Sequence, residues 1–373
     1  TLIQDSLPFN DGYHKGEDTV GAWAMEKVGS LLGVQVTGGS TSVRDAWAPM
    51  RQAGAIAKAM LVSAAAKNWV HAAVRLSPTL DGILESHDPA PALGMPGVLK
   101  VVALENAVAV VADSFWRAKS AVEALDPVFT EGPAKDHSSG SIMALLEDKL
   151  ESGEASPPTV EALYKVPYLA HACMEPMNCT ALVSDEAVEI WMPNQAPTLM
   201  KWYAGDIADV DSENVTIHTP YLGGGFGRRA EIDLAVMAVA IAKEMKDQPV
   251  KLQWTRENDM QHDMYRPAAV SRFRGSLDTG GKTAGWENRI VSQSVGGSFT
   301  ARLLPWMTMD RSDNTTAEGA ADLPYEFSNM RVDHVPVDIP IPVGFWRSVG
   351  HSYNAFFTES FMDEMADAAG QDP

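Results

Sequence analysis

The segment from Gly223 to Arg229 places four glycines and two arginines within seven residues, directly after an alternating run from Val215 to His218 that is typical of a strand. Glycines permit positive φ angles and let a backbone approach a ligand closely. We expect a helix to begin at Ala230, and backbone N–H groups at the start of a helix favour anions. Arg228 and Arg229 would add positive charge beside a phosphate. The pattern therefore predicts a loop that binds an anionic cofactor.

This glycine loop departs from two well-known phosphate-binding patterns. The dinucleotide-binding fingerprint would need a third glycine at the position of Arg228, and the Gly-Lys-Ser/Thr of a P-loop is absent. A nicotinamide- or flavin-dependent dehydrogenase that holds a pyrophosphate on the loop remains an alternative. A tight strand-to-helix turn without any ligand is the simplest alternative.

Two other groups of residues could take part in chemistry. His171 and Glu175 are four residues apart, but no third ligand lies nearby in the sequence, so we expect buried hydrogen-bonding roles rather than a metal site. Cys173 and Cys179 are the only cysteines, and we expect both to be small buried residues. An iron–sulfur cluster usually takes four thiolates, so any such cluster is expected on another chain.

Composition excludes several classes of function. The 373 residues include 49 acidic and 29 basic side chains, for a formal net charge of -20. This balance argues against nucleic-acid binding, which needs clustered lysines and arginines. The chain contains no apolar run of about 18 residues, so no transmembrane segment is expected. The length suggests about two or three domains.

The elements that must position these residues form an α+β pattern. We expect a long helix from Asp45 to Trp69, followed by a small module over residues 70–130. From Val160 the chain is dense in strands, with a hairpin-like pair before a final helix. The expected elements are strands at His71–Leu76, Val98–Leu104, Ala107–Ala112, Ala187–Met192, Asn214–His218, Val250–Trp254, Arg272–Leu277 and Gly285–Gln293, and helices at Phe115–Leu125, 141–151, Ala230–Lys246 and Ala355–Ala369.

Four segments occur in an order that is specific to one family. They are Tyr168–Ala181, Trp191–Pro197, the glycine loop, and Gly344–His351. Together they resemble the large, molybdopterin-binding subunits of the xanthine dehydrogenase and aldehyde oxidase family, and within it the isoquinoline 1-oxidoreductase beta-subunit type. A further segment, Gly33–Arg44, resembles a cofactor-binding turn near the N-terminus of this type. The resemblance covers most of the chain.

The resemblance implies a set of cofactor-binding residues. A glutamine, a Gly-Phe-Gly backbone and an arginine lie around the molybdenum centre of the family, and the N-terminal turn contributes further contacts. In this chain the matching positions are Gln195, Gly224, Gly225, Phe226, Gly227, Arg228, Arg347, Gly38, Gly39, Ser40 and Thr41.

The resemblance also implies a mixed, multi-domain molybdenum-hydroxylase fold. Residues 1–69 would be a piece of the second molybdopterin-binding domain, and residues 70–130 an α/β hammerhead-like module. Residues 131–159 would form a linker and a helix, and residues 160–373 the first molybdopterin-binding domain.

An oxidoreductase activity follows from the same resemblance. It implies a molybdenum hydroxylase that oxidises an N-heterocycle or an aldehyde with water-derived oxygen. The cofactor would be molybdopterin in its cytosine dinucleotide form. The partners would be a small 2Fe-2S subunit, a cytochrome electron acceptor and a small-molecule substrate, and a periplasmic location is favoured over a cytoplasmic one.

The chain departs from the family at the catalytic base. The Gly-Val-Gly-Glu segment that carries the family's glutamate is absent, so no catalytic residue is assigned, and the join at Trp69–Val70 is abrupt for the family. Ala230 stands where xanthine-type enzymes place a substrate-binding acid, which disfavours a purine substrate. We therefore expect a fragment that is inactive alone. A non-catalytic assembly fragment with the same fold is the second alternative.

Overall fold

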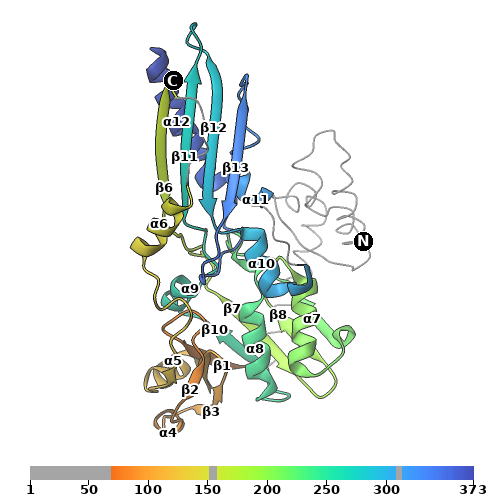
Figure 1. Ribbon diagram of the computed structural model, residues 1–373. Coiled ribbons are helices and arrows are strands. Elements are labelled where there is room, and N and C mark those ends of the chain that lie inside the picture. Colours follow the sequence, from red (N-terminus) through yellow and green to blue (C-terminus); the bar gives the residue numbers. More distant parts are fainter. Residues whose placement is uncertain (1–68, 151–157, 308–312) are drawn as a thin grey trace. The chain divides into compact units, whose positions relative to one another are not determined.

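The computed structural model describes residues 69–150, 158–307 and 313–373 (Figure 1). The expected helix before Trp69 and the predicted turn at Gly38, Gly39, Ser40 and Thr41 lie outside the described residues. The chain divides into two compact units. The first unit contains the described residues up to Pro133 together with Ala172–His262, and the second contains Ala134–His171 and Asp263–Pro373.

The first unit is built on a seven-stranded mixed sheet. Its central strands pair across a long sequence distance, since β1 (Val70–Leu76) runs parallel to β10 (Val250–Gln253) and antiparallel to β4 (Ala107–Ala112). In spatial order the strands are β3 (Val98–Ala103), β4 (Ala107–Ala112), β1 (Val70–Leu76), β10 (Val250–Gln253), β7 (Asn178–Val183), β8 (Val188–Trp191) and β9 (Val215–His218).

Burial explains why these segments form strands and why helices cover them. All six residues of β4 are completely buried, as its unbroken Ala/Val run predicts. The helix α5 (Phe115–Glu123) packs on β1 and β4, and its N-cap Ser114 accepts a hydrogen bond from the amide of Arg117. The remaining helices and short strands are α4 (Ala90–Leu93), α7 (Pro197–Ala208), α8 (Asp233–Lys243), α9 (Arg256–Gln261), β2 (Leu84–Ser86) and β5 (Val128–Phe129).

Two regions that the sequence predicts as separate share this sheet. Strands β1, β3 and β4 come from residues 70–130, and the other four come from residues 160–373. The predicted domain from residue 160 also contributes to both units. The domain boundaries stay predictions, but the sheet is continuous across them.

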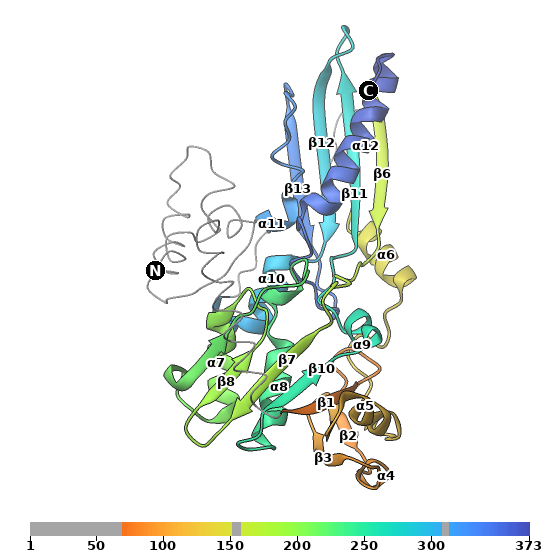
Figure 2. The same ribbon diagram turned by 180° about the vertical axis from the view of Figure 1, so that it is seen from behind.

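The second unit is a four-stranded sheet with one long helix across a face. Its strands, in spatial order, are β13 (Met330–Pro336), β12 (Thr283–Ser292), β11 (Ala269–Leu277) and β6 (Val160–Val166). The predicted hairpin is confirmed, because β11 and β12 pair antiparallel. Figure 2 shows α12 (His351–Ala369) lying against the sheet. The remaining helices are α6 (Ser139–Asp148), α10 (Val295–Leu303) and α11 (Asn314–Ala317).

Aromatic side chains hold α12 against that sheet. Phe273, Trp286 and Phe361 are almost completely buried, and their ring centroids lie 4.9 to 5.3 Å apart. Such ring pairs add to the free energy gained by burying apolar surface. The tilted and edge-on ring geometry fixes the helix on the strands.

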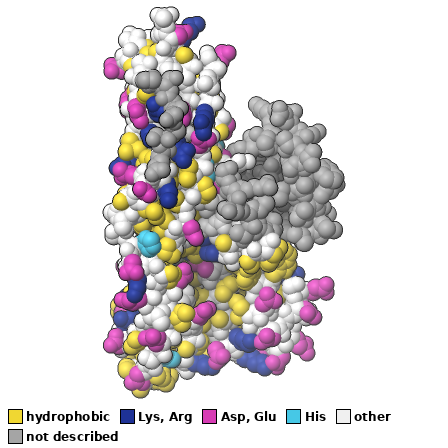
Figure 3. Space-filling model, in the orientation of Figure 1, with side chains coloured by type: hydrophobic (Ala, Val, Ile, Leu, Met, Phe, Trp, Pro, Cys, Tyr) yellow, Lys and Arg dark blue, Asp and Glu magenta, His cyan; other side chains and the backbone are white. Residues whose placement is uncertain are grey.

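The opposite face of the sheet and the rest of the visible surface carry charges of both signs (Figure 3). On this sheet Arg274 lies 3.8 Å from Glu287, and Arg331 lies 2.8 Å from Asp333. Mixed surface charge of this kind stabilises the fold little. Among the described residues, no helix is long and apolar enough to cross a membrane.

Candidate functional site

The glycine loop adopts a backbone that ordinary residues avoid. Gly224 and Gly227 have φ angles of 100° and 107°, and Phe226 has a φ of 53°. Within the described part of the chain, the amide N–H groups of Gly224, Gly225 and Gly227 donate no hydrogen bond. Consecutive free amides in a tight turn form an anion-binding concavity. The loop therefore offers the donors that the sequence predicts.

The predicted helix start is wrong. Arg228–Ala230 form a 3-10 turn, Glu231 is extended, and α8 begins only at Asp233. The loop amides thus do not stand at the N-terminus of an α-helix, and the helix dipole does not act on them directly. Their affinity for an anion must come from the turn itself.

The two arginines after the loop point into the protein. Arg228 is completely buried, and its Nη1 and Nη2 donate to the two carboxylate oxygens of Asp233 at 2.9 and 2.6 Å. Its guanidinium lies 5.9 Å from the ring centroid of Trp254. Arg229 is also completely buried, and this burial lowers its pKa. The contact of Arg228 with the cofactor stays a prediction. Its observed ion pair with Asp233 stabilises the fold around the loop.

Gln195 lies directly beside this turn. Its backbone N–H donates to the carbonyl of Arg229 at 2.8 Å, so the Trp191–Pro197 segment and the glycine loop are joined. Pro197 then opens α7, as proline often does at the first position of a helix. Two of the four predicted segments therefore meet within the first unit.

His171 and Glu175 have separate hydrogen-bonding roles; His171 is buried as predicted, whereas Glu175 is only partly buried. In the second unit, the carboxylate of Asp263 lies 3.0 Å from His171 Nδ1, and both side chains are buried. In the first unit, Glu175 accepts a hydrogen bond from Gly223. Among the described residues, no cluster of three or more metal-ligating side chains occurs. Cys173 and Cys179 are buried, as expected, and they form no disulfide.

Arg347 belongs to the second unit, in a segment anchored by Trp346. The indole Nε1 of Trp346 donates to the carbonyl of Ala170 at 3.1 Å. The guanidinium groups of Arg266 and Arg347 lie 5.8 and 5.3 Å from the Trp346 ring centroid. Arg347 is exposed, so its donors can reach a ligand. Each unit thus carries part of the predicted site.

Strained backbone marks the predicted segments. In the described part of the chain, seven non-glycine residues have positive φ, and three of them are aspartates. Aspartate tolerates this region well. The other four are Ala172, Phe226, Ser348 and Val349, and all four lie in the predicted cofactor segments. Such strain costs about 1–3 kcal/mol per residue and clusters at functional sites.

A serine–histidine pair in the second unit, formed by buried Ser292 and partly buried His334, cannot act as a nucleophilic centre. The Nδ1 of His334 accepts the amide N–H of Asp313 at 3.3 Å, so the ring proton lies on Nε2. That nitrogen lies 3.2 Å from Ser292 Oγ and must donate to it. Burial lowers the pKa of His334, which keeps the ring neutral. A general base needs a free lone pair toward the hydroxyl, and this ring offers none.

Asp313 gives the second unit a pH-dependent stability. Burial acts to raise its pKa, but hydrogen bonds from Thr315, Gly296, Thr316 and Ser294 outweigh burial and lower the pKa below its usual 3.8. A carboxylate with a lowered folded pKa stabilises the fold above the unfolded pKa, and this contribution is lost as the pH falls. We expect Asp313→Asn to be less stable than wild type at pH 7 and to lose less further stability below about pH 4. Urea denaturation across this range measures both slopes, and equal slopes would contradict the prediction.

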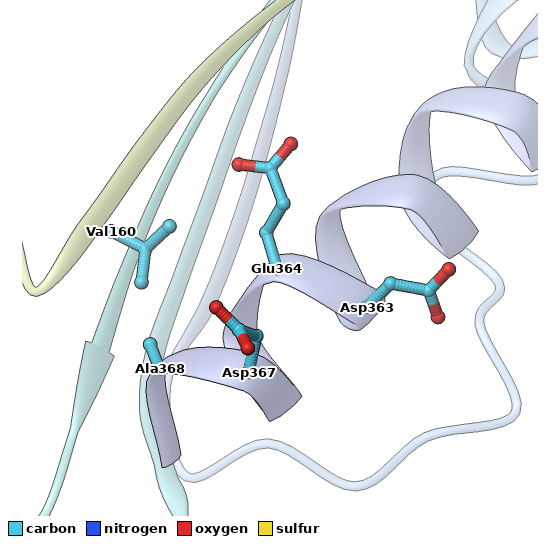
Figure 4. Close-up of a pocket in the computed structure, with 5 residues that line it drawn as sticks. All are labelled: Val160, Asp363, Glu364, Asp367 and Ala368. Atoms are coloured by element: carbon cyan, nitrogen blue, oxygen red, sulfur yellow. The ribbon is translucent and has the colours of Figure 1, made fainter. Parts of the chain in front are cut away.

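A shallow pocket on the second unit lies among acidic side chains of α12 (Figure 4). Val160, Asp363, Glu364, Asp367 and Ala368 line it. Its lining includes none of the predicted site residues. Like-charged carboxylates on a surface are ordinarily solvated, so the pocket is not assigned a function.

Comparison with known families supports a molybdopterin-binding domain. A family model described as the molybdopterin cofactor-binding domain matches residues 137–373, more than half of the chain. The chain belongs to this family. Members of the molybdopterin cofactor-binding domain family bind that cofactor, so the glycine loop and Gln195 lie within a domain of the expected kind.

Characterised relatives match the chain over much of its length. It is 24% identical over 331 residues to isoquinoline 1-oxidoreductase subunit beta of Brevundimonas diminuta, which covers 82% of this chain and 42% of the relative. It is 28% identical over 218 residues to the aldehyde oxidoreductase molybdenum-binding subunit of Escherichia coli strain K12, which covers 57% of this chain and 28% of the relative. The chain thus spans less than half the length of these relatives.

Solved structures confirm the fold. Quinoline 2-oxidoreductase from Pseudomonas putida 86 superposes with a TM-score of 0.61 at 16% identity, over 81% of this chain and 45% of that chain. Aldehyde oxidoreductase from Desulfovibrio desulfuricans superposes with a TM-score of 0.63 at 18% identity, over 82% of this chain and 39% of that chain. The mixed molybdenum-hydroxylase large-subunit fold predicted from the sequence is therefore confirmed.

Some residues of this molybdopterin cofactor-binding domain have roles that the sequence does not reveal. Asn178 donates to Glu175, and Glu175 accepts from Gly223 of the glycine loop. The strained residues Ser348 and Val349 directly follow Arg347. Their only signal in the sequence is that they lie inside the matched segments. Hydrogen-bond partners and φ angles are needed to single them out.

Proposed function

We propose that the chain is the molybdopterin-binding part of a molybdenum hydroxylase that oxidises an N-heterocycle or an aldehyde with water-derived oxygen. The observation that carries this proposal is the coincidence of the family match with backbone strain at Ala172, Phe226, Ser348 and Val349. Strain that persists in a folded protein is typical of ligand-binding and catalytic segments. The names of the relatives support both substrate classes.

The glycine loop fits such a cofactor. The unbonded amides of Gly224, Gly225 and Gly227 suit oxygen acceptors such as phosphate or oxo groups. Together with Phe226 and Gln195 of the same unit, they would contact the cofactor, and Arg347 of the second unit stays a predicted cofactor residue. When bound, molybdopterin supplies the redox chemistry. The residues of this chain would orient it, donate hydrogen bonds to it and shield it from water.

The chain's own residues narrow the substrate class. Ala230, at the position of the substrate-binding acid of xanthine-type enzymes, is 5% exposed and carries no charge. A purine would lose its acidic partner there, so a less polar heterocycle or an aldehyde is favoured. No residue is assigned as the catalytic base, because the family's glutamate segment is absent from this sequence.

The finer assignments rest on the resemblance to the isoquinoline 1-oxidoreductase type. They are the cytosine dinucleotide form of the cofactor, a small 2Fe-2S subunit, a cytochrome electron acceptor and a periplasmic location. The count of two cysteines supports a separate iron–sulfur subunit, since a cluster usually takes four thiolates. Co-purification of an iron–sulfur protein and fractionation of the cells test these assignments directly.

Molybdenum analysis of the complete gene product tests the main proposal. After expression with the cofactor-maturation machinery, we expect bound molybdenum and turnover of isoquinoline-type heterocycles or aldehydes with an artificial electron acceptor. Mass spectrometry of the released cofactor separates a pterin from a nicotinamide or a flavin. The absence of both molybdenum and turnover would favour the non-catalytic alternative. Bound NAD or flavin would favour the dehydrogenase.

A further inference from the structure

The carboxylate of Glu175 binds Gly223, the first residue of the glycine loop. The amide N–H of Gly223 donates to Glu175 Oε2 at 2.7 Å, and Asn178 Nδ2 donates to Glu175 Oε1 at 3.1 Å. The side chain is 20% exposed, so it is mostly shielded from water. Hydrogen bonds to a shielded carboxylate are stronger than those between neutral groups. The first residue of the loop is therefore fixed by a charged acceptor.

The exit of the loop is held against the same residue. Arg229 Nη2 lies 4.0 Å from Glu175 Oε1 and donates to the carbonyls of Glu175 and Pro176 at 3.4 and 3.2 Å. The amide of Glu175 in turn donates to the carbonyl of Gly224 at 3.4 Å. Glu175 thus contacts Gly223, Gly224 and Arg229, at the start, in the middle and at the end of the loop.

Two of the loop glycines leave room for these contacts. A Cβ atom at position 223 would lie 3.1 Å from the Cβ and 3.2 Å from Oε2 of Glu175. A Cβ atom at position 225 would lie 2.7 Å from Cγ of Arg229, closer than real Cβ contacts allow. The glycines at 223 and 225 therefore permit the loop to pack on Glu175 and Arg229.

We propose that Glu175 is a positioning residue that holds the glycine loop in its cofactor-binding conformation. This inference rests on the proposed function. Three residues of the loop have positive φ, and three of its amides donate no hydrogen bond within the described part of the chain. A loop with these properties relaxes unless its surroundings hold it. Donors fixed in advance bind an anionic group without reorganising.

The test compares Glu175→Ala and Glu175→Gln with wild type in the complete protein. In cofactor-free protein, we expect Glu175→Ala to speed amide hydrogen exchange at Gly223 and Arg228 by about tenfold or more, because a charged acceptor is lost. After maturation, its molybdenum content should fall by about tenfold or more. Glu175→Gln keeps an oxygen acceptor for Gly223. It should therefore keep most of the wild-type exchange protection and most of the molybdenum content.

Asp278→Ala is the matched control. Asp278 accepts the amides of Gly280 and Lys282 at 2.8 and 2.9 Å in the turn between β11 and β12, so it also holds a glycine turn through a carboxylate. We expect it to speed exchange only in that turn and to leave the molybdenum content unchanged.

The outcomes separate this inference from the proposed function. Wild-type exchange at Gly223 and Arg228 in Glu175→Ala overturns the inference, and so does faster exchange with undiminished molybdenum. A wild-type protein without molybdenum overturns the proposed function instead, and the exchange measurement still decides whether Glu175 holds the loop.

Discussion

Asp233→Ala is expected to destabilise the first unit by about 3 kcal/mol. The guanidinium of Arg228 is completely buried and makes two hydrogen bonds to the Asp233 carboxylate, at 2.9 and 2.6 Å. Removal of the carboxylate would take away the acceptor of two hydrogen bonds from a buried positive charge. The Asp233 side chain is 28% exposed, which keeps the expected cost at the low end for a buried pair. Denaturant unfolding followed by tryptophan fluorescence measures the loss.

An exposed ion pair in the same unit provides the control. Lys246 and Asp185 form an ion pair in which the side chains are 52% and 77% exposed. Asp185→Ala is therefore expected to cost less than about 1 kcal/mol. Equal losses in the two variants would show that the Arg228 charge does not depend on Asp233.

Gly227→Ala is expected to lose most of its bound cofactor while the protein still folds. Gly227 has a φ of 107° and a ψ of -20°, a conformation that alanine adopts only at a cost of about 1–3 kcal/mol. The loop can avoid this cost by changing its backbone, which would move the unbonded amides of Gly225 and Gly227. We expect molybdenum content to fall by about tenfold or more. Elemental analysis gives the content, and thermal unfolding shows that the fold persists.

Gly370→Ala imposes a similar backbone penalty away from the loop. Gly370 ends α12 with a φ of 67°, and an added Cβ would meet nothing within 4 Å. This variant is expected to lose some stability and to keep its molybdenum. If Gly227→Ala kept as much molybdenum as Gly370→Ala, the loop conformation would not matter for cofactor binding.

Local patterns predict much of the fold. The unbroken apolar run at Ala107–Ala112 and the serine before Phe115 place β4 and α5 correctly, because burial and capping act within a few residues. The start of α8 is predicted three residues too early. Arg228 and Arg229 are buried in a 3-10 turn there, where Arg228 contacts Asp233 and Arg229 contacts the carbonyl of Glu175. Helix propensity does not encode these contacts.

The candidate site is predicted less completely. Motif order selects the segments around Gln195, the glycine loop and Arg347, and the structure joins the first two. The positive φ angles of Phe226 and Val349 are invisible in the sequence, because neither residue type favours them and only tertiary contacts impose them. The roles of the individual residues toward the cofactor stay predictions.

The parallel pairing of β1 with β10 determines how this chain can be dissected. A fragment that began at residue 137, where the family match starts, would lack β1 and leave one edge of β10 without a partner. Val250 and Leu252 of β10 are completely buried in the intact sheet. A newly exposed, apolar edge strand is a template for association with another chain. Fragments intended to stay monomeric should therefore begin no later than Val70.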